Sequence, residues 1–505
     1  MVQAKTDKYK KGSARKEELD DGLVTMIAQD LQPLSIVKDD GFINFCHLLD
    51  KKYQMPCRNT IRNVLLPAKF EQVCGALKTK LDRVESVSVT TDLWTSNTNS
   101  SFMAVTGHFW DPVEDSLESC VLDCRRVHGR HTAQLIKEEL EGILDEYNIR
   151  DKVLAVITDN GSNVVKAVKD ISLRRLSCFA HSLNLVVMDS IKSCPALQET
   201  KEKVSKVVTL TKQSTVAKEK LDKIQADLGR KPKKLLQDVP TRWNSLYLML
   251  LRFLELKDAV ILFLAQSGMD KESGQFGSNH WEVIDQAVQL LKPCYEATVE
   301  MSGEKFATGS KLIPLTKMLM GYYAGEERDS VDGSVRKQIS GVILRNLHNR
   351  FDVFEDVRII QMATLLDPRF KNRCFRSAEK KKNAIALLNK ELKERYEKKQ
   401  LELAPPQERV PPPKQAKRDS LWDKFDSDME QQVCVRGPLP DFSDVDLKNF
   451  FGLPCQPRQS DPLQWWSFAG KKRFPEMYAI ATKYLSFPAT SVPSERVFSS
   501  SGEIV

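Results

Sequence analysis

The stretch ESVSVTTDLWT, residues 85–95, decides the fold, because the hydrophobic period changes there from that of a helix to that of a strand. Polar and apolar residues alternate in it and β-branched residues are frequent, which is typical of a half-buried strand. Two similar segments follow after short polar turns, SFMAVTGHFWD at 101–111 and DSLESCVLDCRRV at 115–127. Three consecutive strands with short connections predict an antiparallel meander.

The next part of the chain alternates between helix and strand. Apolar residues three and four apart follow His131 and Thr132, which predicts a helix over 131–149. KVLAVITDNG, residues 152–161, is a short continuous apolar run, as expected of a strand buried on both faces. The last three segments of this part are a helix, a short strand and a helix, at 162–171, 174–178 and 180–192.

Helical patterns dominate outside this part. Before it, residues 39–55 and 70–84 carry apolar residues at helical spacing. After about residue 196 strand signals largely vanish, and the longest helical patterns lie at 242–265, 281–298 and 380–399. The Pro-rich segment APPQERVPPPK, residues 404–414, follows the last of these and is read as a linker. We therefore expect an α/β domain followed or interrupted by an all-α one.

Composition excludes several classes of protein. The chain has 505 residues, of which 41% are hydrophobic and 29% charged, and no apolar run approaches the roughly 18 residues that a membrane span needs. Its N-terminus is charged and lacks the apolar core of a secretory signal. The eleven cysteines form no Cys-x-x-Cys motif, so we predict neither a disulfide framework nor bound zinc. These features indicate a protein of the cytosol or nucleus.

Positive charge is concentrated in one segment. The formal net charge is +8, and residues 201–234 contain eleven Lys and Arg against four Asp and Glu, a net +7. Such a segment can contact nucleic-acid phosphates or direct nuclear import. It can equally be the solvated face of a helix, and the charge pattern leaves both interpretations open.

Two aspartates end predicted strands. Asp92 lies at the end of the first strand and Asp159 at the end of the fourth. If these strands are neighbours, the two carboxylates lie side by side at one edge of the sheet, where hard oxygen ligands suit Mg²⁺ or Mn²⁺. The alternative is that each aspartate only ends a strand, since Asp-Asn-Gly forms turns wherever it occurs.

Seven segments then resemble, in this order, one known family. They are TTDLWTS with SSFMAVTGHF downstream, ITDNGSNVVKA, CFAHSLNLVV, DVPTRWNS, LLDPRF, DPLQWW and SVPSERVFSSSG. They look like the hAT superfamily of cut-and-paste DNA transposases and, more narrowly, its relatives called zinc finger BED domain-containing proteins. The resemblance runs from about Ser86 to the last residue.

The resemblance implies a ribonuclease H-like mixed sheet interrupted by a large all-α insertion. The implied parts are an N-terminal helical region at 1–85, a ribonuclease H-like core at 86–195, a helical insertion at 196–460 and an incomplete C-terminal dimerisation region at 461–505.

It also implies an Asp-Asp-Glu site whose members match Asp92, Asp159 and Glu495, and which would hold two Mg²⁺ or Mn²⁺ ions for phosphoryl transfer. Glu495 has an alternative role, because an acidic residue in the first turn of a helix is favoured by the helix dipole.

Further residues match family motifs. Cys178 and His181 match a Cys-x-x-His pair, for which we expect a structural role beside the acidic site or, for His181, a role in positioning DNA. Arg242 and Trp243 match an Arg-Trp pair, in which the tryptophan either stacks on an unpaired base or anchors a helix start. The basic cluster before them contributes four further candidate DNA contacts, Arg230, Lys231, Lys233 and Lys234.

Two departures from the family guide the functional prediction. Residues 1–85 lack the Cys and His spacing of a BED finger, and the chain breaks off inside the dimerisation region, as expected of a fragment. We predict a transposase-derived nuclear protein that binds DNA, self-associates as a homodimer or higher oligomer weakened by the truncation, and has lost catalysis. The alternative is an active transposase that cleaves and joins DNA with divalent metal ions. Neither a membrane nor a small-molecule substrate is expected.

Overall fold

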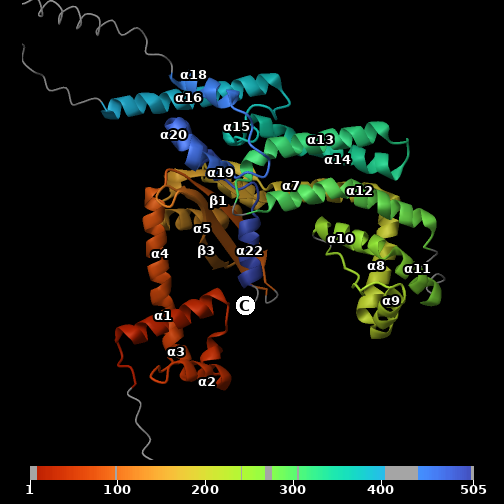
Figure 1. Ribbon diagram of the computed structural model, residues 1–505, viewed down its shortest axis with the longest axis horizontal. Coiled ribbons are helices and arrows are strands. Elements are labelled where there is room, and N and C mark those ends of the chain that lie inside the picture. Colours follow the sequence, from red (N-terminus) through yellow and green to blue (C-terminus); the bar gives the residue numbers. More distant parts are fainter. Residues whose placement is uncertain are drawn as a thin grey trace, which may run out of the picture. The chain divides into compact units, whose positions relative to one another are not determined.

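The computed structural model describes residues 8–96, 99–239, 242–267, 276–303, 306–403 and 442–501. The chain forms two compact units. The first combines residues 1–181 with 487–505, and the second comprises Ser182–Ser486. Two segments distant in the sequence therefore build the first unit, while the second is continuous (Figure 1).

A mixed five-stranded sheet forms the centre of the first unit, in the order β3-β2-β1-β4-β5. Its strands are β1 (Val87–Thr95), β2 (Ser101–Asp111), β3 (Ser116–Val127), β4 (Val153–Thr158) and β5 (Arg175–Ser177). The first three pair antiparallel, whereas β1–β4 and β4–β5 pair parallel. The predicted meander and the predicted neighbourhood of the first and fourth strands are both confirmed.

The two faces of the sheet are covered differently. One face carries α5 (Ala133–Glu146) and α6 (Ser162–Asp170), whose apolar residues form one buried cluster with Val87 and Val89 of β1. Thr132 caps α5 by accepting a hydrogen bond from the Leu135 amide, which explains the polar start expected from the sequence. Successive side chains of a strand point to opposite faces, so the even-numbered residues of β1 face away from this cluster.

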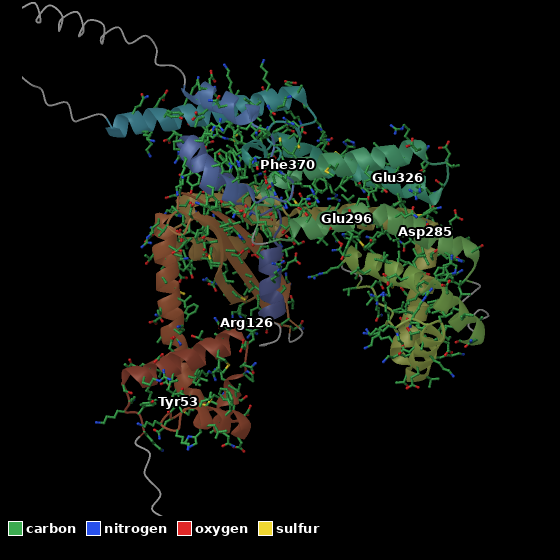
Figure 2. All side chains as sticks on the ribbon, in the orientation of Figure 1. Tyr53, Arg126, Asp285, Glu296, Glu326 and Phe370 are labelled. Atoms are coloured by element: carbon green, nitrogen blue, oxygen red, sulfur yellow. The ribbon has the colours of Figure 1, made fainter. Side chains whose placement is uncertain are left out.

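Short helices form the N-terminal part of the first unit. They are α1 (Ala14–Gln29), the 3₁₀ turn η1 (Leu34–Lys38), α2 (Asp40–Leu49), α3 (Arg58–Thr60), the π-helical turn η2 (Ile61–Leu65) and α4 (Leu66–Arg83). Leu23, Val24 and Ile61 belong to their small separate core. Tyr53, labelled in Figure 2, donates a hydrogen bond to Asp20 (2.9 Å) and so ties the segment after α2 to α1.

Helices are the main elements of the second unit's described residues. After α7 (Phe179–Ser193), in which the boundary between the units falls, its elements are α8 (Pro195–Gln213), α9 (Thr215–Asp227), α10 (Trp243–Glu255), α11 (Lys257–Ser267), α12 (Ser278–Met301), η4 (Gly309–Lys311), α13 (Leu312–Asp329), α14 (Val335–Phe351), η5 (Asp352–Asp356), α15 (Arg358–Leu366), α16 (Ala378–Leu403), α18 (Phe442–Gly452), α19 (Pro462–Trp465), η6 (Trp466–Gly470), α20 (Lys471–Arg473) and α21 (Pro475–Leu485). The single helical pattern at 242–265 divides into two helices at Leu256.

Trp466 is a central packing residue of the second unit. Its ring is fully buried, and its indole N–H donates to the Leu366 carbonyl at 2.7 Å. A Cβ at position 470 would lie 2.2 Å from the ring, so only Gly470 leaves room for it. The hydrogen bond joins α15 to the segment after the Pro-rich residues 404–414, which lie outside the described residues.

Among the helices that the structure describes, none is both long and apolar enough to cross a membrane.

Candidate functional site

The register of the central strands brings Asp92 and Asp159 to corresponding positions. Thr90 of β1 pairs with Ile157 of β4, and each aspartate lies two residues further along its chain. Because paired residues of parallel strands share a face and side chains alternate with a period of two, both aspartates belong to the face opposite α5 and α6. Asp92 is still within β1, whereas Asp159 follows immediately after β4.

Glu495 reaches the same face from the other end of the chain. It lies in the first turn of α22 (Val492–Ser501), a helix that packs on β1 and β2. The preceding residue, Ser494, is fully buried, and its hydroxyl lies 2.5 Å from the hydroxyl of Thr90. Thr90 is two residues before Asp92, so this contact attaches the helix that carries Glu495 beside the aspartate edge.

The Ser494–Thr90 contact begins a buried chain of polar groups. The Thr90 hydroxyl is 2.6 Å from that of Thr106 on β2, which in turn lies 2.9 Å from Nε2 of His108. Burial lowers the pKa of His108 to about 3, so its ring is neutral at physiological pH and can either donate to or accept from Thr106. The four groups form one continuous network from α22 across two strands.

Cys178 supports the start of α22. Its thiol is buried and accepts hydrogen bonds from the amides of Ser491 (3.3 Å) and His181 (3.5 Å). Burial raises the pKa of the Cys178 thiol, and the charge of Glu495 adds to this increase. The Cys178 amide donates to the carbonyl of Thr158, the residue before Asp159 (2.7 Å). Cys178 therefore connects the end of β4 to the residue before the helix of Glu495, and His181 contributes only its backbone amide to this arrangement.

Asp159 also takes part in a turn. The Gly161 amide donates to its Oδ1 at 3.1 Å, as in the turn that the sequence offered as an alternative. Arg175 of β5 donates to the Asp159 carbonyl and, at 2.7 Å, to Asn160 Oδ1. Burial lowers the pKa of this arginine, and the negative charge of Asp159 opposes the decrease. A positive charge thus already lies beside Asp159.

The fit of a metal ion can be judged from these placements. Three carboxylates are suitable ligands for Mg²⁺ or Mn²⁺ by chemistry. However, no three His, Cys, Asp or Glu side chains within the described ranges are close enough to hold an ion together. Asp92 and Asp159 follow corresponding positions of β1 and β4, and Glu495 lies in a helix packed on β1 and β2; a metal site formed by the three carboxylates stays a prediction.

The Arg-Trp pair begins α10. Trp243 is only 2% exposed, its amide donates to Asn184 Oδ1 at 3.2 Å, and its ring lies beside that of Tyr247. This burial favours the anchoring alternative over stacking on a base. Arg242 is exposed and, with Lys192 and Lys201, lines a cavity of about 140 Å³.

The basic cluster 230–234 lies in an extended segment after α9. Gln225 holds this segment through both polar atoms of its side-chain amide: Oε1 accepts from the Lys233 amide (3.0 Å), and Nε2 donates to the Lys233 carbonyl (3.1 Å). Arg230 pairs with Asp258 at 2.7 Å and Lys233 with Glu255 at 3.4 Å. Lys231 and Lys234 are exposed and enter no ion pair among the described residues.

Sequence reasoning did not find Ser494, Thr90, Thr106, His108 and Arg175. The hydroxyl residues are ordinary strand and helix residues by type, and Ser494 and Thr90 are separated by 404 positions. The TTD motif with Thr90 and the PSER motif with Ser494 both lie in segments that resemble the family. Only this resemblance could have indicated that the two motifs belong to one site.

Comparison with known proteins agrees with this architecture. Residues 90–182 match the ZBED1 RNase-like domain, residues 176–290 the ZBED1 RNase-like helical domain, and residues 446–505 the hAT family C-terminal dimerisation region. The mixed α/β unit is thus ribonuclease H-like, and the chain belongs to the hAT superfamily.

Individual relatives narrow the assignment. The chain is 26% identical to zinc finger BED domain-containing protein 4 of Homo sapiens, over 95% of its own length and 41% of the relative. It is 27% identical to the putative AC transposase of Zea mays, over 94% of its length and 60% of the relative. Within the superfamily the chain is a member of the group related to zinc finger BED domain-containing proteins, and it spans about two fifths to three fifths of the length of these relatives.

Proposed function

We propose that this chain is a DNA-binding, self-associating nuclear protein derived from a hAT transposase, in which catalysis has lapsed. The observation that carries the proposal is the ordered basic segment 230–234. Its backbone is held by Gln225, while Lys231 and Lys234 remain exposed and outside the ion pairs of the described residues. A positive segment of defined shape can neutralise phosphates and release their counterions. Binding to DNA is also the reason to expect the protein in the nucleus.

Self-association is supported by the match to the hAT dimerisation region. Much of the aromatic and apolar content of that region is buried within the second unit, including Trp466, Ile480, Ala481 and Leu485. Phe468 differs, because 73% of its surface is exposed. Phe468 follows the half-buried Ser467 and precedes the exposed Ala469, and an aromatic side chain exposed in this region is a suitable contact for a second copy. The side chains of two further apolar residues of this region, Phe498 and Ile504, lie outside the described residues.

The loss of catalysis is proposed from the acidic residues. Asp159 lies in a turn beside the cationic Arg175, and this positive charge competes with a metal ion for its carboxylate. The second candidate is metal-dependent DNA strand transfer, which the matched register positions of Asp92 and Asp159 favour.

The salt dependence of DNA binding tests the proposal. We expect the double variant Lys231→Ala with Lys234→Ala to weaken binding to duplex DNA at low salt. It should reduce the slope of log K against log[salt] by about 1.8, if each lysine neutralises one phosphate. Fluorescence anisotropy of a labelled duplex at several NaCl concentrations measures both quantities.

Arg230→Ala with Lys233→Ala is the matched control, because it removes the same charge from the same segment. Those two cations are already paired with Asp258 and Glu255, so the slope should change less. An unchanged affinity and slope in both double variants would show that the segment is only a solvated face.

A further inference from the structure

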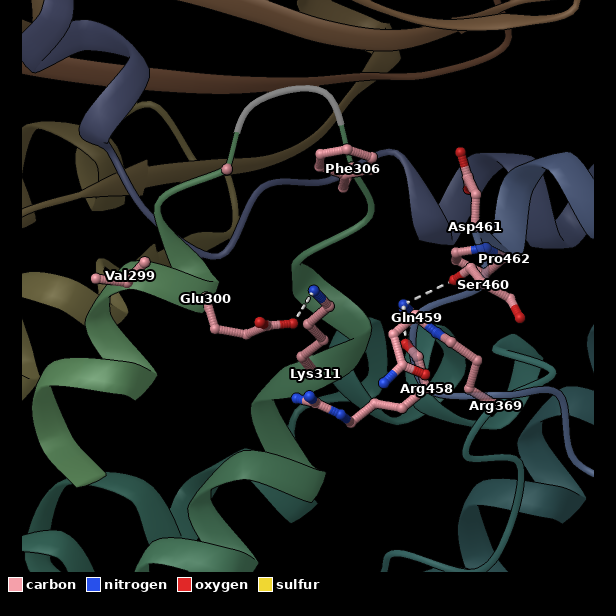
Figure 3. A pocket seen from close by; sticks show the side chains of 11 residues that line it. Val299, Glu300, Phe306, Lys311, Arg369, Arg458, Gln459, Ser460, Asp461 and Pro462 are labelled. Carbon is pink, nitrogen blue, oxygen red and sulfur yellow. Dashed lines mark hydrogen bonds and ion pairs between the residues drawn. The ribbon is translucent and has the colours of Figure 1, made fainter. Parts of the chain in front are cut away.

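A cavity of about 340 Å³ in the second unit gathers cationic side chains from three separate segments (Figure 3). Lys311 comes from η4, Arg369 follows α15, and Arg458 precedes α19. Glu300, near the end of α12, and the exposed Phe306 also line it. This volume lies at the small end of the range for ligand sites in proteins.

Two of the three cations already have acidic partners. Lys311 Nζ lies 2.5 Å from Glu300 Oε1, an ion pair drawn in Figure 3. Arg369 pairs with Asp367 at 2.6 Å, and both side chains are at most 4% exposed. Arg458 is exposed and enters no ion pair within the described part of the chain. Arg458 is therefore the one of the three cations that forms no ion pair among the described residues, although a further carboxylate, that of Asp461, also lines the cavity.

Arg369 also organises the segment that carries Arg458. Its Nη1 donates to the carbonyls of Ser460 (3.2 Å) and Arg458 (3.5 Å). The carboxylate of Asp461 accepts from the Leu463 amide (2.9 Å) and points away from Lys311 and Arg458 in Figure 3, so it does not occupy the N–H donors of these two cations. The cationic groups are thus held at the cavity by contacts that leave Arg458 available.

Glu300 is the group in the cavity that an anionic ligand would meet. Its hydrogen bond to Lys311 lowers its pKa against the opposing effect of burial, and the charges of Lys311, Arg458 and Arg369 lower it further. The carboxylate therefore experiences the combined field of all three cations, and a bound anion would compete with it for Lys311.

We propose that this cavity is a binding site for a phosphate group and that Glu300 acts as an internal competitor which weakens it. Arginine guanidinium groups bind phosphate oxygens through paired N–H donors, and a lysine adds a compact positive charge. Phe306 at the rim, 58% exposed, offers a face on which a nucleotide base can stack. A backbone phosphate of DNA or a free phosphate ester supplies the same chemistry. The first source rests on the DNA binding proposed above; the second does not.

Titration with inorganic phosphate tests the site without DNA. Isothermal calorimetry of the full chain, at ionic strength held constant with NaCl, should show saturable binding that Arg458→Gln weakens at least fivefold. Glu300→Gln should tighten it about fivefold to tenfold, because a competing negative charge is removed. Arg328→Gln is the matched control, since it removes one positive charge from an exposed position of α13.

The opposite responses of two exposed positions make the test independent of folding. Weakening by Arg458→Gln with tightening by Glu300→Gln supports the site. Equal phosphate binding by the wild type, Arg458→Gln and Glu300→Gln would overturn it.

A parallel titration with a DNA duplex separates the sources. Loss of both phosphate and DNA affinity in Arg458→Gln supports a DNA phosphate, whereas loss of phosphate affinity alone supports a free phosphate ester. If the wild type does not bind DNA, the proposed function is wrong. The phosphate titration still tests whether the cavity binds a phosphate group.

Discussion

Two adjacent threonines of β1 should respond oppositely to the same substitution. Thr90 and Thr91 are both at most 1% exposed. The Thr90 hydroxyl contacts Ser494 at 2.5 Å and Thr106 at 2.6 Å. The Thr91 hydroxyl points to the opposite face, next to the apolar cluster of Val89, and has no hydrogen-bond partner among the described residues. Valine replaces either hydroxyl by a methyl group of similar size.

The expected free-energy changes follow from these contacts. Thr90→Val loses the bond to Thr106, about 1 kcal/mol, while Thr106 keeps His108 as a partner. It also leaves the buried Ser494 hydroxyl without Thr90, which costs about 1–3 kcal/mol, so the total destabilisation is about 2–4 kcal/mol. Thr91→Val instead removes an unsatisfied buried hydroxyl and should stabilise the protein by about 1 kcal/mol.

Local hydrogen exchange is the suitable assay, because a chain of two units does not unfold in one two-state transition. Exchange of amides in β1 and α22, followed by mass spectrometry, should accelerate in Thr90→Val and slow in Thr91→Val. In a double-mutant cycle, Thr90→Val with Ser494→Ala should cost at least about 1 kcal/mol less than the sum of the single variants. Equal effects of the two valines, or a coupling energy near zero, would refute the network that positions α22.

Three further outcomes are expected. Burial lowers the pKa of His108 to about 3 from 6.5, so only the unfolded chain gains its proton as the pH falls below 6.5. Stability is then full above pH 6.5 and falls by about 1.4 kcal/mol per unit towards pH 3. Hydrogen exchange of the β2 amides at several pH values should show a shallower fall in His108→Gln. Millimolar Mn²⁺ should change the Tm of the wild type no more than that of Asp92→Asn; a Mn²⁺-dependent rise lost in the variant would instead favour strand transfer. Phe468→Ser should shift sedimentation towards the monomer, and an unchanged profile would exclude Phe468 from the contact.

The strands could be predicted because their signals are local. Alternation and β-branched residues around 85–95 and the buried run at 152–161 depend on neighbouring residues only, and the structure has strands at both places. The placement of Asp92 and Asp159 at corresponding positions then follows from strand order, since adjacent parallel strands end at the same edge.

The contacts that support α22 could not be predicted in the same way. A serine in a helix and a threonine in a strand carry no pattern that says they will meet, and the bond between Ser494 and Thr90 depends on the tertiary fold. The role of Trp243 was equally open, because a buried and a stacking tryptophan look the same in sequence. The basic segment was visible, but only the structure shows that Arg230 and Lys233 are paired with acidic residues of α11 and α10.

Hydrogen bonds join the residues at which the chain leaves the first unit, near Phe179, to those at which it returns, near Ala489. On leaving, the Phe179 amide donates to the Ala489 carbonyl (3.0 Å), and Cys178 accepts from the Ser491 amide. Cys178 is itself bonded to the end of β4 through Thr158. All of these contacts lie within the first unit, so the junction does not need a contact with the intervening residues. The position of Glu495 therefore depends on a few contacts at the junction and on Ser494 with Thr90, and variation in the helical unit can leave it unchanged.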